Sequence, residues 1–284
     1  MTEVVPFPAS LSPSRASDFT TCPLLFRFRS IDRLPEEPSP AAVRGTVVHR
    51  ALELLYDLPA AERTVSEAER LAELAFVELE SAEPESAAAL RTGPDGAPEL
   101  GAGPLLESYF RLEDPTRLEP HARELEVSAE VTPQFSLRGF IDRVDRTGDG
   151  RVRIVDYKTG RSPSAGFEAK AMFQMRFYAL VWWRMTGEVP TLLQLMYLAD
   201  RTVIRYEPDE DDLRATERRI LALREAIEKA ADAERFEAKP SRLCDWCSYR
   251  DMCPAWEGTP PPLPPRSEWP TSSRMATSEE SVDD

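Results

Sequence analysis

The spacing of hydrophobic residues along the chain changes near Pro120. Before this proline, apolar residues recur three or four positions apart, as they do on one face of a helix. This spacing predicts helices over residues 41–58, 64–82 and about 105–112. After the proline, apolar runs bounded by turn residues predict strands over 125–131, 137–146 and 152–157. We therefore expect a helical region followed by a sheet.

Helices and strands alternate in the remainder of the chain. A helix is predicted over about 165–185, followed by a strand over 191–198 that is apolar enough to be buried on both faces. A strand over 202–207 pairs back on it, and a long charged amphipathic helix covers 211–236. After Gly258 the sequence is rich in proline and then in serine and acidic residues, which predicts a disordered tail.

The second and third predicted strands flank the turn sequence Thr-Gly-Asp-Gly and so predict a β-hairpin. If its loop comprises residues 148–150, Asp142 stands directly opposite Asp156 on one face. Lys158 projects from the same face, because side chains alternate along a strand. Two facing carboxylates in an apolar element repel each other unless a cation joins them. A divalent metal is the simplest such cation; the alternative is that these charges form solvated cross-strand ion pairs.

Lysine is rare in this chain, which has 35 Lys and Arg residues together but only four Lys. The first of them is Lys158. A lysine ammonium is a compact charge whose pKa can fall when it is desolvated, whereas the guanidinium of arginine stays charged. Lysine at this position therefore suits a residue that orients or deprotonates a water molecule.

The chain has two histidines, and one of them, His49, lies on the helix predicted over 41–58. Taken alone, His49 is best interpreted as a polar residue at a helix edge. A neutral imidazole beside two carboxylates would, however, form a mixed nitrogen and oxygen site suited to Mg²⁺ or Mn²⁺. The sequence has neither a Gly-x-Ser-x-Gly elbow nor a Gly-x-x-x-x-Gly-Lys-[Ser/Thr] loop, which argues against serine-hydrolase chemistry and ATP-driven translocation.

A formal charge of -15 and a pI near 4.8 argue against a protein that coats duplex nucleic acid through its overall charge. A local basic groove is compatible with these totals. No run of about 18 apolar residues is present, which predicts no membrane span. The N-terminus lacks the basic start and apolar core of a signal peptide, so we expect a cytoplasmic, reducing location.

The four cysteines gain weight in a reducing compartment, where paired disulfides are unusual. Cys244, Cys247 and Cys253 form a Cys-x2-Cys-x5-Cys cluster, and Cys22 is the remaining partner. Four thiolates can hold Zn²⁺ or an iron–sulfur cluster. The long separation of Cys22 from the other three favours the iron–sulfur cluster over zinc, with disulfides or free thiols as further alternatives. Either metal site would join the two ends of the chain.

These motifs together resemble one known family. The motifs are His49 on a helix, Gly-Phe-Ile-Asp142-Arg-Val-Asp, Val-Asp156-Tyr157-Lys158-Thr-Gly, and Gln174-x-x-x-Tyr178, whose two named residues share a helix face. Their order and spacing resemble the RecB-family exonuclease domain of the PD-(D/E)XK nuclease superfamily. With the four cysteines added, the chain is similar to the iron–sulfur branch, which includes CRISPR-associated exonucleases and the nuclease domain of AddB-type helicase–nucleases. The resemblance spans roughly residues 12–256.

The resemblance implies an α/β fold with a mixed β-sheet flanked by helices, a helical N-terminal insert and a four-cysteine cluster joining the two ends. It implies a role for each motif residue. Asp142, Asp156 and Lys158 would be catalytic, and His49, Asp142, Asp156 and the Tyr157 carbonyl would bind Mg²⁺ or Mn²⁺. Gln174 and Tyr178 would support the site and contact DNA. Cys22, Cys244, Cys247 and Cys253 would hold a 4Fe-4S cluster, with zinc as the alternative.

Five segments follow from this interpretation. They are an N-terminal segment 1–40 with the first cysteine, a helical region 41–118 with His49, a nuclease core 119–236, a cluster-binding segment 237–257 and a disordered acidic tail 258–284. The expected function is a metal-dependent DNA exonuclease that acts on single-stranded DNA or DNA ends in repair or recombination, with a possible helicase or repair partner. The alternative is a non-catalytic iron–sulfur DNA-binding subunit of a repair or helicase–nuclease complex.

Overall fold

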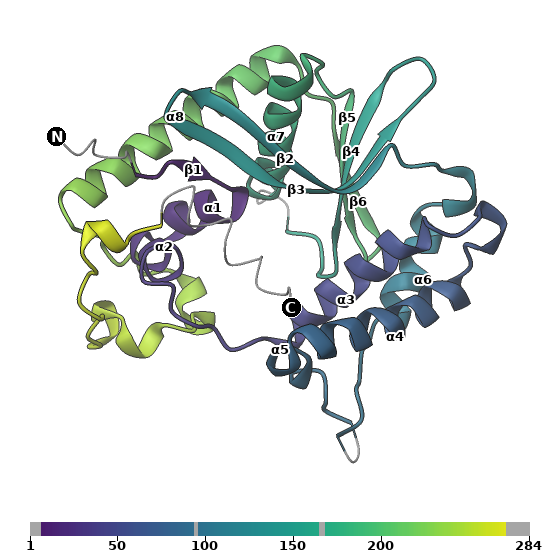
Figure 1. Cartoon of the computed structure of the whole chain (residues 1–284), viewed down its shortest axis with the longest axis horizontal. Helices are drawn as coiled ribbons and strands as arrows, with labels where there is room; N and C mark the ends of the chain where they lie inside the picture. Colours follow the sequence, from purple (N-terminus) through teal and green to yellow (C-terminus); the bar gives the residue numbers. More distant parts are fainter. Residues whose placement is uncertain (1–6, 94–95, 165–167, 271–284) are drawn as a thin grey trace, which may run out of the picture. The chain divides into compact units, whose positions relative to one another are not determined.

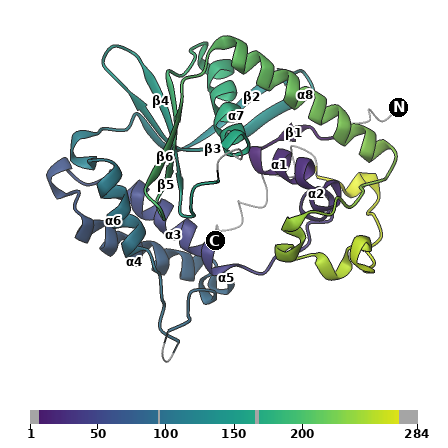
Figure 2. The same cartoon turned by 180° about the vertical axis from the view of Figure 1, so that it is seen from behind.

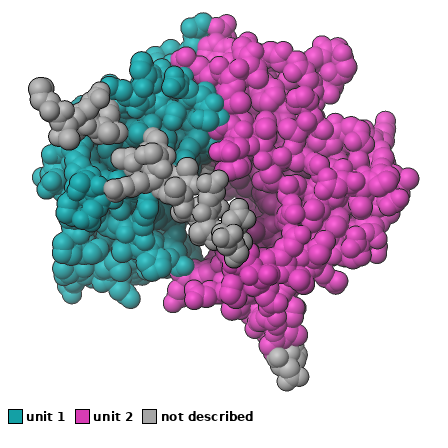
Figure 3. Space-filling view, in the orientation of Figure 1, with its two compact units in different colours: residues 1–36, 128–139, 213–284 teal, residues 37–127, 140–212 magenta. Residues whose placement is uncertain are grey.

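The computed structural model describes residues 7–93, 96–164 and 168–270 of the 284-residue chain. The chain divides into two compact units (Figure 3). Unit 1 comprises residues 1–36, 128–139 and 213–284, and unit 2 comprises residues 37–127 and 140–212. The two longest strands and the last long helix begin in one unit and end in the other, so each unit contains segments that are far apart in sequence.

Unit 1 holds the N-terminal helices and most of the last long helix (Figure 1). Its elements are β1 (Ser10–Leu11), α1 (Pro13–Thr21), α2 (Pro23–Ser30), most of α8 (Glu210–Asp232) and the short helices η4 (Arg242–Trp246), η5 (Arg250–Met252), η6 (Pro254–Trp256) and η7 (Arg266–Glu268). Both α1 and α2 begin with proline, whose missing N–H costs nothing at a helix start. β1 runs parallel to the first part of β3, with Ser10 opposite Ser136.

Unit 2 contains a mixed sheet with helices on both faces (Figures 1 and 2). Its strands come from β2 (Ala122–Thr132), β3 (Phe135–Arg146), β4 (Val152–Lys158), β5 (Leu192–Tyr197) and β6 (Thr202–Tyr206). Its helices are α3 (Pro40–Leu55), η1 (Ala60–Glu62), α4 (Val65–Ala82), α5 (Pro84–Ala88), α6 (Gly103–Leu112), η3 (Pro115–Arg117) and α7 (Glu168–Thr186). β4 and β5 are parallel, whereas β3 with β4 and β5 with β6 are antiparallel.

The two faces of β4 meet different helices. Val155 and Tyr157 join the buried cluster formed by the apolar residues of α3, α4 and α6. Asp156 and Lys158 project from the opposite face, where Gln174 of α7 contacts both side chains. The helical region predicted before Pro120 thus covers one face of the sheet, and α7 packs against β4 and β5 on the other.

Each helix and strand predicted from the pattern is present, with ends shifted by a few residues. Of the tail expected over residues 258–284, the structure describes residues 258–270. Trp269 is only 2% exposed and packs edge-to-face on Phe7 and Phe236. A single large aromatic side chain can anchor a proline-rich segment whose average composition suggests disorder. The rest of the predicted tail, 271–284, lies outside the described residues. In the described part of the chain, no helix is long and apolar enough to cross a membrane.

Candidate active site

The β3–β4 hairpin has the register that its turn sequence predicts. Arg143 lies opposite Val155, and the N–H of Thr147 donates to the carbonyl of Arg151 at 3.0 Å, which leaves a three-residue loop, 148–150. Gly150 has φ +88°, a conformation that glycine adopts readily. Continuing this register by one residue beyond Arg143 places Asp142 opposite Asp156, as the sequence predicts.

His49 of α3 connects to both strands of the hairpin. Its Nδ1 lies 3.4 Å from Oδ2 of Asp142, and its Nε2 lies 3.0 Å from the carbonyl oxygen of Tyr157. The same carboxylate oxygen of Asp142 accepts a hydrogen bond of 2.7 Å from the backbone N–H of Tyr157. Burial lowers the pKa of His49, but the hydrogen bond and charge of Asp142 outweigh it and raise the pKa to about 9. Without a bound cation, His49 is therefore protonated at neutral pH.

Asp156 is buried, and its carboxylate contacts the side chains of Lys158 and Gln174, two residues of the predicted motifs. Its Oδ2 lies 2.6 Å from Nζ of Lys158, and its Oδ1 accepts a 2.8 Å hydrogen bond from Nε2 of Gln174. Oε1 of Gln174 accepts a 2.9 Å bond from Lys158, and Nε2 of Gln174 lies 3.3 Å from the Tyr178 hydroxyl. Burial and the charge of Asp142 raise the pKa of Asp156 to about 6. Gln174 therefore fixes the acid and the lysine relative to each other.

The protonation of Lys158 differs from the sequence-based expectation that desolvation lowers its pKa. Burial does lower the pKa of Lys158, but the adjacent Asp156 carboxylate raises it above its ordinary value. Lys158 therefore carries a positive charge near neutral pH. It is suited to hold a water molecule or to stabilise negative charge, and less suited to act as a base.

Glu124 is a site residue that the sequence analysis missed. One carboxylate oxygen each from Glu124 and Asp142 and one nitrogen of His49 all lie within 4.8 Å of one another. Glu124 lies on β2, which pairs with β3, and its φ of +40° is unusual for a residue other than glycine. Burial and the charge of Asp142 raise the pKa of Glu124 to about 7. In the sequence Glu124 directly precedes the strand predicted from Leu125, and nothing local indicated which residue of β3 it faces.

The donor set fits a divalent cation of the Mg²⁺ or Mn²⁺ kind. Ionised Glu124, Asp142 and Asp156 carry three negative charges and Lys158 one positive charge, which leaves a surplus of two negative charges when His49 is neutral. The raised pKa values of Glu124 and Asp156 have the same two causes, burial first and the nearby Asp142 charge second. Carboxylate oxygens with one imidazole nitrogen are ligands that such cations accept.

The four cysteines belong to unit 1, whereas the donor set of His49, Glu124 and Asp142 belongs to unit 2. All four are free, and all four line one pocket together with Phe28 and Trp256. Backbone N–H groups of Lys239 and Ser241 donate to the sulfurs of Cys22 and Cys244 at 3.4 and 3.3 Å. Burial and the neighbouring thiols raise the pKa of Cys247. Among the described residues, no three cysteine sulfurs lie within 4.8 Å of one another. The disulfide alternative does not agree with these free thiols.

The fold and the site define an α/β protein whose central hairpin carries an acidic site with one lysine. The family model of the PD-(D/E)XK nuclease superfamily matches residues 10–254, and the chain belongs to this superfamily. Its mixed sheet flanked by helices is the fold expected from the resemblance. No curated protein matches the chain.

Two solved structures illustrate how far the similarity extends. A provisionally named exonuclease from Eubacterium rectale is 12% identical with a TM-score of 0.51, over 84% of this chain and 92% of that chain. The protein SSO0001 is 13% identical with a TM-score of 0.40, over 87% of each chain. At such low identity the first similarity shows a common fold alone.

Proposed function

We propose that this protein is a Mg²⁺- or Mn²⁺-dependent deoxyribonuclease that acts as an exonuclease on single-stranded DNA or DNA ends. The observation that carries the proposal is that Asp142, Asp156 and Lys158 of the hairpin lie together and that His49 of α3 contacts Asp142, in a chain of the PD-(D/E)XK nuclease superfamily. The exonuclease assignment is supported by the name of the structural neighbour from Eubacterium rectale.

His49, Asp142, Asp156 and the Tyr157 carbonyl would hold the cation, and Glu124 extends this donor set. A bound divalent cation would polarise the phosphoryl oxygen and lower the pKa of a coordinated water. Before the cation can bind, His49 must lose the proton that Asp142 stabilises. Metal binding is therefore expected to release protons.

The other residues of the site would position the attacking water and stabilise the negative charge that develops on the phosphate. The Lys158 ammonium can donate hydrogen bonds to the attacking water or to a phosphate oxygen as negative charge develops there. Gln174 keeps this ammonium next to Asp156, and the Tyr178 hydroxyl in turn contacts Gln174. Gln174 and Tyr178 are also the residues of this group that we expect to contact DNA.

Degradation of end-labelled single-stranded DNA in the presence of Mn²⁺ tests this proposal. Asp156→Ala and Lys158→Ala should each reduce cleavage by at least about 100-fold, the loss expected when one electrostatic stabiliser is removed. Asp149→Ala is the matched control, because Asp149 lies in the exposed turn of the same hairpin, paired with Arg151. Absence of Mn²⁺-dependent cleavage, or equal cleavage by all variants, would favour the non-catalytic DNA-binding subunit.

We also propose that Cys22, Cys244, Cys247 and Cys253 hold a 4Fe-4S cluster. What supports a shared ligand is that all four cysteines line one pocket, and the choice of iron over zinc rests on the resemblance. Anaerobically purified protein should be brown and contain iron, whereas zinc without iron would refute the assignment. A role in DNA repair or recombination, with a helicase or repair protein as partner, is proposed from the resemblance alone.

A further inference from the structure

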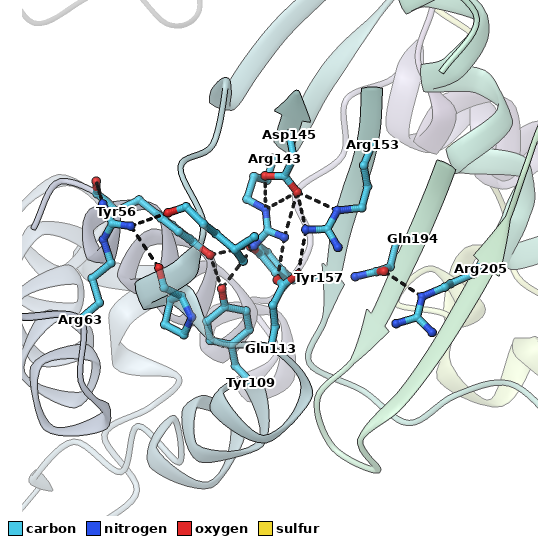
Figure 4. A network of polar contacts seen from close by, with 12 residues as sticks. Tyr56, Arg63, Tyr109, Glu113, Arg143, Asp145, Arg153, Tyr157, Gln194 and Arg205 are labelled. Carbon is cyan, nitrogen blue, oxygen red and sulfur yellow. Dashed lines mark hydrogen bonds and ion pairs between the residues drawn. The ribbon is translucent and has the colours of Figure 1, made fainter. Parts of the chain in front are cut away.

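A buried arginine of β3 is at the centre of a network of polar contacts (Figure 4). It projects from the face of the hairpin opposite to the candidate active site, because side chains alternate along a strand. Arg143 immediately follows Asp142 and is 1% exposed. Its Nη1 donates to three phenol oxygens, those of Tyr56 at 2.9 Å, Tyr109 at 3.2 Å and Tyr157 at 2.6 Å. These tyrosines come from the end of α3, from α6 and from β4, so one guanidinium connects three elements of unit 2.

The charges of this network cancel within it. Arg143 contacts Glu113 at 2.6 Å and Asp145 at 3.0 Å, and Arg153 contacts the same two carboxylates at 2.8 and 2.7 Å. Two cations therefore face two anions, in contrast to the surplus of negative charge on the other face of the hairpin. A charge-balanced, hydrogen-bonded cluster of this kind is rigid and requires no further ion.

Tyr157 links the buried network to the donor set. Its hydroxyl accepts the shortest of the three bonds from Arg143. Its backbone N–H donates to Oδ2 of Asp142, and its carbonyl oxygen lies 3.0 Å from Nε2 of His49. A residue held at its side chain by a rigid network has little freedom at its backbone. The network thereby fixes the Tyr157 N–H that contacts Asp142 and the Tyr157 carbonyl that contacts His49.

We propose that Arg143 and the Tyr157 hydroxyl are positioning residues that act through the Tyr157 backbone to hold Asp142 and His49 in the geometry for a divalent cation. This inference rests on the proposed function. Mutation of residues that hydrogen-bond to metal ligands, without binding the metal themselves, commonly lowers metal affinity by about 10- to 100-fold. Tyr56 and Tyr109 are bonded to the same guanidinium but are not hydrogen-bonded to the donor set, so loss of their hydroxyls should not lower metal affinity in this way.

Tyr157→Phe and Tyr56→Phe are matched variants that test the proposal, because both hydroxyls accept from the same Nη1 of Arg143. Each variant removes one buried hydroxyl and keeps the ring. Mn²⁺ affinity is measured directly from the electron paramagnetic resonance signal of free Mn²⁺, and Tm is measured on the same samples. We expect Tyr157→Phe to raise the Kd for Mn²⁺ about tenfold, and Tyr56→Phe to change it less than about twofold, at similar losses of Tm.

Equal changes in Kd for the two variants, or no change in either, would overturn the positioning role and leave the network as core structure only. If the wild-type protein binds no Mn²⁺, both the proposed function and this inference fail. If the expected difference in Kd is found in a protein that does not cleave DNA, the positioning role stands and the proposed nuclease activity fails. Arg143→Lys, which keeps the charge but not the planar fork, should raise the Kd as Tyr157→Phe does.

Discussion

At the scale of single residues, the site is defined by carboxylates held close together. Asp142 lies at the centre, because the pKa values of His49, Glu124 and Asp156 all respond to its charge. Each of these groups binds its proton more tightly in the folded, metal-free protein than in the unfolded chain. In the metal-free protein, protons bound to these groups therefore partly offset the repulsion between the carboxylates. A bound divalent cation would offset the same repulsion.

The pH dependence of stability follows from the direction of these shifts. His49 has a folded-state pKa of about 9, above its ordinary value of 6.5. Its contribution to stability is fully present below pH 6.5 and is lost as the pH rises through 9. We expect the Tm of the metal-free protein to fall between pH 6.5 and 9, and His49→Asn to weaken this fall. An identical pH profile for the variant would contradict the interaction of His49 with Asp142.

Glu124 provides a second test at this scale. Its pKa of about 7 means that at about pH 8 it is ionised next to Asp142 at a cost to the metal-free fold. This cost falls as the pH is lowered through 7 and is lost only below the ordinary value of 4.5. Glu124→Gln should therefore raise the Tm relative to wild type at about pH 8 without metal, and this rise should shrink as the pH falls towards 4.5. The same variant should weaken Mn²⁺ binding if Glu124 is a ligand. A lower Tm at the higher pH would show that Glu124 makes a favourable contact in the metal-free protein.

At the scale of elements, the sequence predicts the part of the candidate site that lies on the hairpin and on α7. A glycine-containing turn fixes the register of the strands that it joins, so the opposition of Asp142 and Asp156 was readable from the turn. Lys158 follows from alternation along the strand and the Gln174–Tyr178 contact from helical spacing. Glu124 was not predictable, because its approach to Asp142 depends on how β2 pairs with β3. The environment of Arg143 was not predictable either, because its phenol partners lie on distant helices.

The turn offers a test of this register. Gly150 has φ +88° and open space around the position of a Cβ, whereas the neighbouring Gly148 has open space without a positive φ. Gly150→Ala should reduce the free energy of unfolding by about 1 kcal/mol through backbone strain alone, and Gly148→Ala should have a smaller effect. Urea denaturation of both variants measures the difference. Equal effects would indicate that the loop conformation is not required for the hairpin.

At the scale of the whole molecule, the two sites that we propose lie in different units. The donor set belongs to unit 2, and the four cysteines belong to unit 1. The two sites should therefore respond independently to mutation. Cys247→Ser is expected to lower the iron content and the Tm, whereas Asp156→Ala should leave the iron content at the wild-type level. Loss of iron in Asp156→Ala would contradict this independence.

We propose that the carboxylates of this hairpin hold the cation with which the protein cleaves phosphodiester bonds. The most direct test of this proposal is the rate of nucleotide release from end-labelled single-stranded DNA, as a function of Mn²⁺ concentration, for wild type, Asp156→Asn and Asp149→Asn. These variants change one charge each at nearly constant shape, at the site and in the turn of the same hairpin. We predict Mn²⁺-dependent release by wild type and Asp149→Asn, and at least about a 100-fold lower rate for Asp156→Asn. Equal rates for Asp156→Asn and wild type would contradict a role of Asp156 in cleavage.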